Sequence, residues 1–209
     1  MTTPLGTFDV AAREGRRVTV ARRTRETDIA VTLDLDGTGA ADVRTGVGFL
    51  DHLLCSFAHH GLFDLAVRAT GDLEIDEHHT VEDVALVLGA ALAESLGDRA
   101  GIVRFGEASI PLDEALATAV VDVGGRPYAV VDLAFRGERV GALPTQLVEH
   151  ALEAFARTSG TTLHLRGTGR NDHHLAEAAF KALARALRAA VAVDPRRAGA
   201  VPSTKGSLG

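Results

Sequence analysis

The sequence contains almost none of the residues that form disulfides or aromatic stacking surfaces. Cys55 is the only cysteine among the 209 residues, so no disulfide can form within the chain. Tryptophan is absent and tyrosine occurs once, which leaves no series of aromatic rings on which the bases of a single-stranded nucleic acid could stack. These absences argue against a disulfide-stabilised protein and a single-strand-binding protein, and we expect a reducing, cytoplasmic location.

Long hydrophobic runs and an excess of positive charge are also missing. No apolar run reaches the roughly 20 residues of a membrane-spanning helix, and residues 1–6 lack the basic-then-apolar order of a secretory signal. The formal net charge is −6, whereas general nucleic-acid binding requires clustered cations that neutralise phosphates. We therefore expect no membrane and no nucleic-acid partner, although a few local cations could hold a small anionic substrate.

A histidine-pair motif occurs twice in the chain. Residues 76–83 read DEHHTVED and residues 171–177 read NDHHLAE. Residues four apart lie on one face of an α-helix, so the first histidine and the glutamate of each motif can contact one ion. Adjacent helical residues point about 100° apart, so the second histidine of each pair faces elsewhere. A single such motif is more often an ordinary surface or core histidine, but two copies favour a metal site.

Two further histidines complete a possible ligand set. His52 lies in the helix-periodic segment 47–60 and His150 in the helix-periodic segment 146–156, each ahead of one histidine pair. The candidate metal ligands are therefore His52, His78, His79, Glu82, His150, His173, His174 and Glu177. Shared between two ions, these groups give three imidazoles and one carboxylate each. That number would saturate tetrahedral zinc, so the set favours an octahedral metal with positions left for a substrate.

The same order of elements occurs in both halves of the chain. Strand-like alternation in residues 16–37 is followed by a helix, a strand at 62–67 and the first histidine-pair helix at 80–96. The second half has strand patterns at 119–123 and 128–135, helix 146–156, strand 161–165 and helix 175–193. We therefore expect one α+β domain over residues 1–209, made of two repeats (about 15–100 and 101–195) and a C-terminal tail (196–209).

Other polar residues have simpler interpretations. His59 and His60 lie at a helix end, where a cation suits the helix dipole, and His164 alternates within a strand, so we expect none of them to bind metal. Glu26 can be a solvated strand charge. The tail segment 202–206, PSTKG, can be a disordered terminus, or its hydroxyl two residues from a lysine can hold a phosphate.

These segments together resemble the imidazoleglycerol-phosphate dehydratase family of histidine biosynthesis. The resemblance is carried by residues 48–52, 71–83, 171–177 and 202–206, and it extends from about residue 22 to residue 206. It implies a duplicated fold, similar to domain 2 of ribosomal protein S5, in which each half is a four-stranded sheet with two helices on one face. It further implies two Mn²⁺ per subunit at subunit interfaces and a homo-oligomer of 24 subunits built from trimers.

The resemblance also assigns roles to individual residues. One ion would take His52, His78, Glu82 and His174, and the other would take His79, His150, His173 and Glu177. Catalytic roles fall on Glu26, His78 and His174. The substrate or phosphate contacts are Glu26, Arg104, Arg126, Lys181, Ser203 and Lys205. Relatives often carry glutamine where this chain has Ser56, and the chain has no room for the phosphatase domain fused to some relatives.

The implied reaction removes water from imidazoleglycerol phosphate and gives imidazole acetol phosphate. Metal ions on both ring nitrogens would hold the substrate as imidazolate, which expels the adjacent hydroxyl and leaves a diazafulvene-like intermediate. Glu26 would then take the newly acidic proton. Two alternatives are a two-metal hydrolase, which needs a metal-bound water as nucleophile, and a metal-storage or metal-sensing protein, which would have no use for the candidate phosphate-binding cations.

Overall fold

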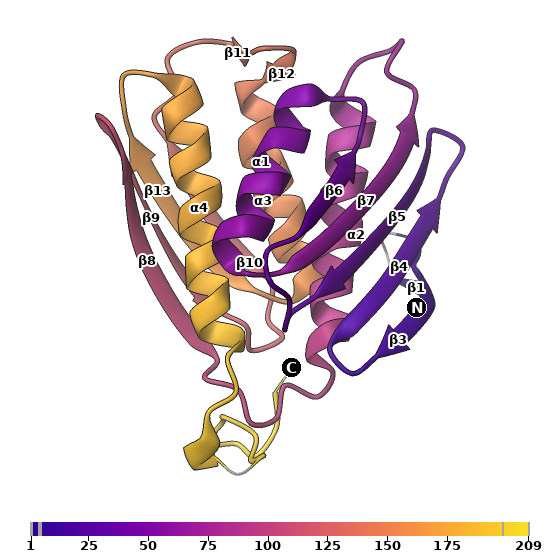
Figure 1. The fold of residues 1–209 in the computed structure, drawn as a ribbon, viewed down its shortest axis with the longest axis vertical. Coiled ribbons are helices and arrows are strands. Elements are labelled where there is room, and N and C mark those ends of the chain that lie inside the picture. The colour runs from indigo at the N-terminus through magenta and orange to yellow at the C-terminus, as the bar shows by residue number, and fades with distance from the viewer. Residues whose placement is uncertain (1, 4–5, 198, 209) are drawn as a thin grey trace.

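Alternating apolar residues build two β-sheets, and four helices fill the space between them (Figure 1). The computed structural model describes residues 2–3, 6–197 and 199–208. The remaining positions of the expected domain, residues 1, 4–5, 198 and 209, lie outside the described residues, and two of them belong to the expected tail. Within the described part of the chain, no helix is long and apolar enough to cross a membrane.

The first sheet has the strand order β3-β4-β5-β7-β6. Its strands are β3 (Asp9–Glu14), β4 (Arg17–Arg23), β5 (Thr27–Asp34), β6 (Ala41–Arg44) and β7 (Asp64–Gly71). Neighbouring strands are antiparallel except β6 and β7, which are parallel. On β5, Ile29, Val31 and Leu33 are buried on the face that the helices cover.

The second sheet repeats the arrangement of β4 to β7, with the strand order β8-β9-β13-β10. Its strands are β8 (Phe105–Leu112), β9 (Ala115–Asp122), β10 (Tyr128–Leu133) and β13 (Thr162–Thr168). Here too the first three strands are antiparallel and the last pair is parallel. The expected duplicated α+β fold is therefore confirmed, and β3 adds a fifth strand to the edge of the first sheet.

Each half contributes two helices to the middle of the molecule. They are α1 (Gly48–Gly61) and α2 (His78–Leu96) from the first half, and α3 (Thr145–Ser159) and α4 (Asp172–Val191) from the second. Helix α1 packs against α4, and α2 packs against α3, so the two halves join through their helices. All four helices begin at the upper end of the view in Figure 1. Short pairs β1 (Thr2–Thr3) with β2 (Gly6–Thr7), and β11 (Arg139–Val140) with β12 (Leu143–Pro144), complete the strands.

A buried ion pair ties α2 to the first sheet. Asp83 on α2 is 7% exposed, contacts the guanidinium of Arg22 on β4, and accepts a hydrogen bond from the hydroxyl of Thr27 at 2.5 Å. Removing one member of a buried ion pair leaves the other charge in a low-dielectric environment, which is costly. This network therefore fixes the helix that carries the first histidine pair.

We expect Asp83→Ala to lower the free energy of unfolding by about 3–5 kcal/mol, because Arg22 loses its buried carboxylate. Denaturant unfolding of the metal-free protein at fixed chain concentration measures this. Asp36→Ala is the matched control, since Asp36 pairs with Arg16 at 3.1 Å on the surface and should lose less than about 1 kcal/mol. Equal losses in the two variants would contradict this account of Asp83.

Candidate active site

The first group of candidate ligands joins α1 to α4. Glu177 lies one turn after His173 on α4, and His52 reaches them from α1. The Nε2 atoms of His52 and His173 lie 2.7 and 2.9 Å from the same carboxylate oxygen, Glu177 Oε1. Two imidazoles and a carboxylate that converge in this way can hold a divalent cation.

The second group is its counterpart on α2 and α3. His78 and Glu82 lie one turn apart on α2, and His150 comes from α3. The Nε2 atoms of His78 and His150 lie 3.7 and 3.4 Å from the carboxylate of Glu82. His150 Nε2 is buried and has no hydrogen-bond partner among the described residues, which fits a ring nitrogen directed at a metal position.

The structure divides these ligands differently from the resemblance. His52 lies with His173 and Glu177, not with His78 and Glu82, so the grouping within one chain differs from the partition that the resemblance implies for ions at subunit interfaces. The reason is the helix packing: α1 contacts α4, and α2 contacts α3, so each single histidine meets the histidine pair of the opposite half. Each group thus combines both halves of the chain.

The second histidine of each pair belongs to neither group, as the helical geometry predicts. The ring planes of His78 and His79 are 85° apart, and those of His173 and His174 are 88° apart. Among the described residues, the ligand groups of this chain include neither His79 nor His174.

Two carboxylates that the sequence analysis did not single out hold these diverging rings. Asp72 Oδ2 lies 3.0 Å from His79 Nδ1, and Glu114 Oε2 lies 3.0 Å from His174 Nδ1. The hydrogen bond with Asp72 raises the pKa of His79. The hydrogen bond with His174 is the largest of several that lower the pKa of Glu114 to about 2. Both contacts involve Nδ1, so Nε2 of each ring is the nitrogen left for a metal, although the carboxylate of Asp113 lies 3.9 Å from Nε2 of His174.

Glu26 lies beside the first of these rings. It precedes β5, its side chain is 55% exposed, and its carboxylate is 3.9 Å from His79 Nδ1. The expected active-site glutamate therefore lies at the same end of the molecule as the histidine pairs. Its exposure leaves the carboxylate accessible to a bound molecule.

Lys181 also belongs to this end. It lies one turn after Glu177, with Nζ 2.5 Å from the carboxylate and a side chain only 17% exposed. Burial raises the pKa of Glu177, but hydrogen bonds from Lys181, His52 and His173 outweigh it and lower the pKa to about 2. Glu177 is therefore an ionised carboxylate at neutral pH, as a metal ligand must be.

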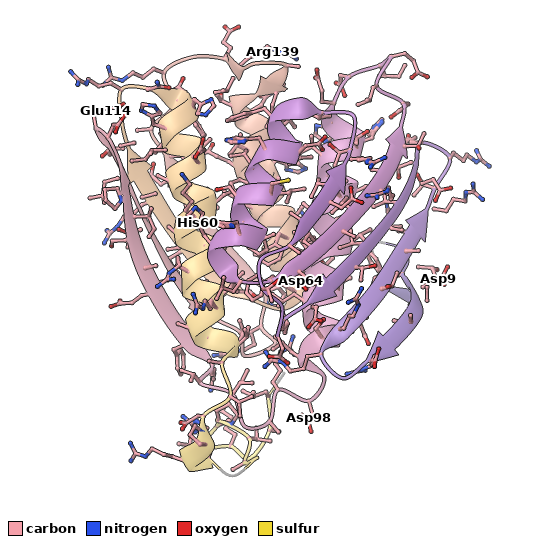
Figure 2. All side chains as sticks on the ribbon, in the orientation of Figure 1. Asp9, His60, Asp64, Asp98, Glu114 and Arg139 are labelled. Atoms are coloured by element: carbon pink, nitrogen blue, oxygen red, sulfur yellow. The ribbon has the colours of Figure 1, made fainter. Side chains whose placement is uncertain are left out.

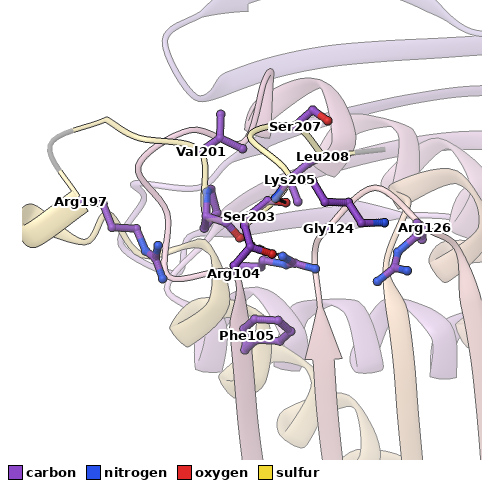
Figure 3. A pocket seen from close by; sticks show the side chains of 12 residues that line it. Arg104, Phe105, Gly124, Arg126, Arg197, Val201, Ser203, Lys205, Ser207 and Leu208 are labelled. Atoms are coloured by element: carbon purple, nitrogen blue, oxygen red, sulfur yellow. Dashed lines mark hydrogen bonds between the residues drawn. The ribbon is translucent and has the colours of Figure 1, made fainter.

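The other side chains predicted to contact the substrate line a pocket at the opposite end of the molecule. Arg104, Arg126, Ser203 and Lys205 line a pocket of about 550 Å³, and Figure 3 shows the charged side chains converging on it. The sequence analysis did not identify Arg197, which lines the same pocket. The described part of the tail thus forms a wall of a cationic pocket, as the phosphate-binding interpretation requires.

Arg104 holds this pocket together. Its guanidinium donates two hydrogen bonds to Asp122, at 2.8 and 2.9 Å, and a third to the carbonyl of Pro202 at 2.8 Å. An arginine has five N–H donors, so two remain for an anion. Arg104 therefore anchors the tail and can contact a ligand from the same position.

The two candidate regions are too far apart in one chain to contact one small molecule. The backbone N–H of Arg104 donates to the carbonyl of Ala190 near the end of α4, so it lies about 25 Å along the helix from His173 at 1.5 Å per residue. Figure 2 places Glu114 at the end where the helices begin and Asp98 at the opposite end. The three carbons and one oxygen between the ring and the phosphorus of the expected substrate span less than roughly 10 Å.

The other histidines stay outside the ligand groups. Within the described residues, neither group includes His59, His60 or His164. Burial, followed by the charge of Lys181, lowers the pKa of His60.

Comparison with known proteins gives a consistent result over nearly the whole chain. The family model described as imidazoleglycerol-phosphate dehydratase matches residues 45–187. The protein of that name from Methanoculleus marisnigri is 59% identical over 189 residues, which cover 90% of this chain and 97% of the relative. The one from Dinoroseobacter shibae is 56% identical over 194 residues, 92% of this chain and all of the relative.

Solved structures agree with these sequence matches. The crystal structure of imidazoleglycerol-phosphate dehydratase from Staphylococcus aureus has a TM-score of 0.74 at 36% identity, and the match covers 83% of this chain and 98% of that one. The Pyrococcus furiosus structure, in complex with (S)-C348, has a TM-score of 0.77 at 37% identity and covers 90% and 99%.

Proposed function

The chain belongs to the imidazoleglycerol-phosphate dehydratase family, and from that premise we propose that it dehydrates imidazoleglycerol phosphate to imidazole acetol phosphate in histidine biosynthesis. The observation that carries the proposal is the pair of matched His₂Glu groups on the facing helices. An imidazole substrate has two ring nitrogens, and two metal positions suit such a ring. A phosphate tail suits the cationic pocket.

The active site of this proposal is built from more than one chain. The ligand groups and the cationic pocket lie about 25 Å apart along α4, so a single substrate reaches both only if the pocket of one copy meets the helix ends of another. His79 and His174, which the ligand groups of the described residues do not include, would complete the metal positions across such a contact. These requirements support a closed homo-oligomer, and we propose the 24-subunit assembly of trimers that the family resemblance implies.

Two Mn²⁺ per subunit fit the residues present. One would be held by His52, His173 and Glu177, and the other by His78, Glu82 and His150, with the diverging histidines as additional ligands. The mixed set of imidazole and carboxylate suits such a cation. When bound, the ions supply Lewis-acid polarisation of the imidazole ring, which makes loss of the neighbouring hydroxyl easier.

The chain's own residues perform the remaining steps. Glu26, exposed beside the diverging ring of His79, can take the proton from the carbon next to the one that lost its hydroxyl, which leaves the enol. The enol then gains a proton on the carbon attached to the ring and becomes the ketone. Lys181, held against Glu177, places a cation next to the metal group for the substrate phosphate. Arg126, Ser203 and Lys205 orient the phosphate, so that the reacting carbon stays near Glu26.

Lys205→Ala should raise KM by about 10- to 100-fold, because a charge-assisted phosphate contact contributes about 1.5–3 kcal/mol. Steady-state kinetics with imidazoleglycerol phosphate measures the change. Lys205→Arg keeps the charge and should lose much less. A chain that ends at Val201 and keeps the wild-type KM would show that the tail has no part in binding.

Turnover tests the function itself. Metal-loaded protein given imidazoleglycerol phosphate should form the ketone product, and protein stripped of metal should not. Hydrolysis of phosphate esters without ketone formation would support a two-metal hydrolase instead, and bound metal with no turnover of either kind would support metal storage.

A further inference from the structure

The two diverging histidines are held in the same way by two carboxylates, neither of which belongs to a ligand group of the described residues. In both cases a carboxylate oxygen lies 3.0 Å from Nδ1 of the ring, Asp72 for His79 and Glu114 for His174. A neutral imidazole that carries its proton on Nδ1 has its lone pair on Nε2, the atom available to a metal. The contacts therefore set both the orientation of each ring and the nitrogen that can act as a ligand.

Glu114 is itself fixed in place by backbone groups, whereas Oδ1 of Asp72 is buried and has no hydrogen-bond partner among the described residues. Oε1 of Glu114 accepts hydrogen bonds from the backbone N–H groups of Arg170 and Asn171, at 2.9 and 2.6 Å, which ties it to the segment just before α4. Oε2 is left for His174. The side chain of Asp72 is 19% exposed and that of Glu114 is 21% exposed. Both can therefore hold a ring rather than remain solvated surface charges.

The two carboxylates come from different places in the repeat. Glu114 immediately precedes β9, and the residue in the same position of the first half is Glu26, immediately before β5. Asp72 immediately follows β7, whereas the residue after β13 is Gly169. A Cβ at Gly169 would lie 2.9 Å from the Cβ of Ala115, so the second half has no space for an acidic side chain there.

The carboxylate that contacts the diverging histidine therefore comes from a different position in each half. In the second half the carboxylate before the strand contacts the ring directly. In the first half Asp72 makes that contact, and Glu26 remains 3.9 Å away and 55% exposed. The carboxylate proposed as the base is therefore not required to hold the ring.

We propose that Asp72 and Glu114 are positioning residues that keep His79 and His174 protonated on Nδ1. Nε2 of each ring is then presented to a metal ion whose other ligands come from another copy of the chain. This inference rests on the two-metal site of the proposed function. Asp72 supports binding of the ion that His79 ligates, and Glu114 supports binding of the ion that His174 ligates.

The test uses Asp72→Ala and Glu114→Ala, with Asp72→Asn and Glu114→Gln as variants that keep an acceptor oxygen. Asp28→Ala is the control, because Asp28 pairs with Arg23 on the surface of the first sheet and belongs to neither ligand group among the described residues. Nitrogen-15 NMR of histidine in the metal-free protein, at a pH where the rings are neutral, reports which ring nitrogen carries the proton. Titration with Mn²⁺ reports the affinity of each ion.

We expect each alanine variant to lose the Nδ1–H form of one ring and to bind one of its two ions about 10- to 100-fold more weakly. The other ion, bound with wild-type affinity, shows that the variant is folded. The amide variants should keep the Nδ1–H form and lie between wild type and alanine in affinity.

Unchanged ring protonation and unchanged affinity for both ions in the alanine variants would overturn the inference and leave the proposed function standing. A wild-type protein that binds no Mn²⁺ would instead defeat the proposed function. The two failures are therefore distinguishable.

Discussion

His78→Ala should lose about one bound metal ion per chain and essentially all dehydratase activity. His78 is one of three ligands on the facing helices α2 and α3, and its loss leaves only His150 and Glu82 in that group. An ion acting as a Lewis acid contributes several kcal/mol to the transition state, so kcat should fall by about 10³-fold or more. Metal analysis of the purified protein and a turnover assay measure the two effects.

His59→Ala provides the matched comparison. His59 also lies on a helix, α1, but it belongs to neither ligand group among the described residues. We expect wild-type metal content and activity from this variant. Equal losses from His59→Ala and His78→Ala would show that the ligand assignment is wrong.

Removal of the metal should reduce the protein from a large closed shell to a small oligomer, and Mn²⁺ should restore both the shell and the activity. The reason is that ligands contributed by two chains exist as a site only where those chains meet, so the binding free energy of the ion becomes free energy of association. Light scattering of chelated and reloaded protein measures the mass in both states. Low pH should act in the same direction, because protonated imidazoles cannot bind metal.

An unchanged mass after chelation would mean that every ligand of an ion comes from one chain. The metal would then stabilise each subunit without joining it to its neighbours. In that case the free energy of unfolding would fall on chelation while the oligomer kept its size, and the dehydratase assignment would be unaffected.

The sequence predicted the class of fold because helical and strand periodicity differ clearly in this chain. The helices around His52, His78, His150 and His173 were all expected within a few residues of their observed bounds. Strands β3, β6 and β8 were not assigned. On β8, for example, Phe105 faces outward and is 57% exposed, so its pattern does not match that of a simple half-buried strand.

The ligand types were predictable, but their grouping was not. Spacing along one helix shows that His173 and Glu177 share a face. It says nothing about which histidine of another helix lies opposite, and that depends on α1 packing against α4. The roles of Asp72 and Glu114 also depend on contacts between segments, since Glu114 is 60 residues from the ring that it contacts.

The sequence also did not predict that the cationic pocket lies far from the histidine groups. Lys181 and Lys205 were both expected to contact the substrate, yet in one chain they lie at opposite ends, with Lys181 against Glu177 and Lys205 in the tail pocket. Residue spacing gives the length of α4, but it does not show that the tail packs beside Arg104 near the end of that helix. The distance between the two regions supports our proposal that at least two copies of the chain build one active site.

Complementation between two defective chains tests this proposal most directly. One chain carries His78→Ala, and the other carries Arg126→Ala and Lys205→Ala, so the first lacks a metal group and the second lacks a functional pocket. Each is assayed alone at low substrate concentration. The two are then dissociated by chelation, mixed in equal amounts and reassembled with Mn²⁺, and a tag on one of them confirms that mixed particles form.

If the pocket of one chain serves the metal groups of another, random mixing leaves about one quarter of the sites with both parts intact. The account therefore predicts that the mixture recovers about a quarter of wild-type activity, whereas a chain carrying all three substitutions stays inactive. Mixed particles with no more activity than the two variants assayed separately would contradict the account, because they would show that each active site is built from a single chain.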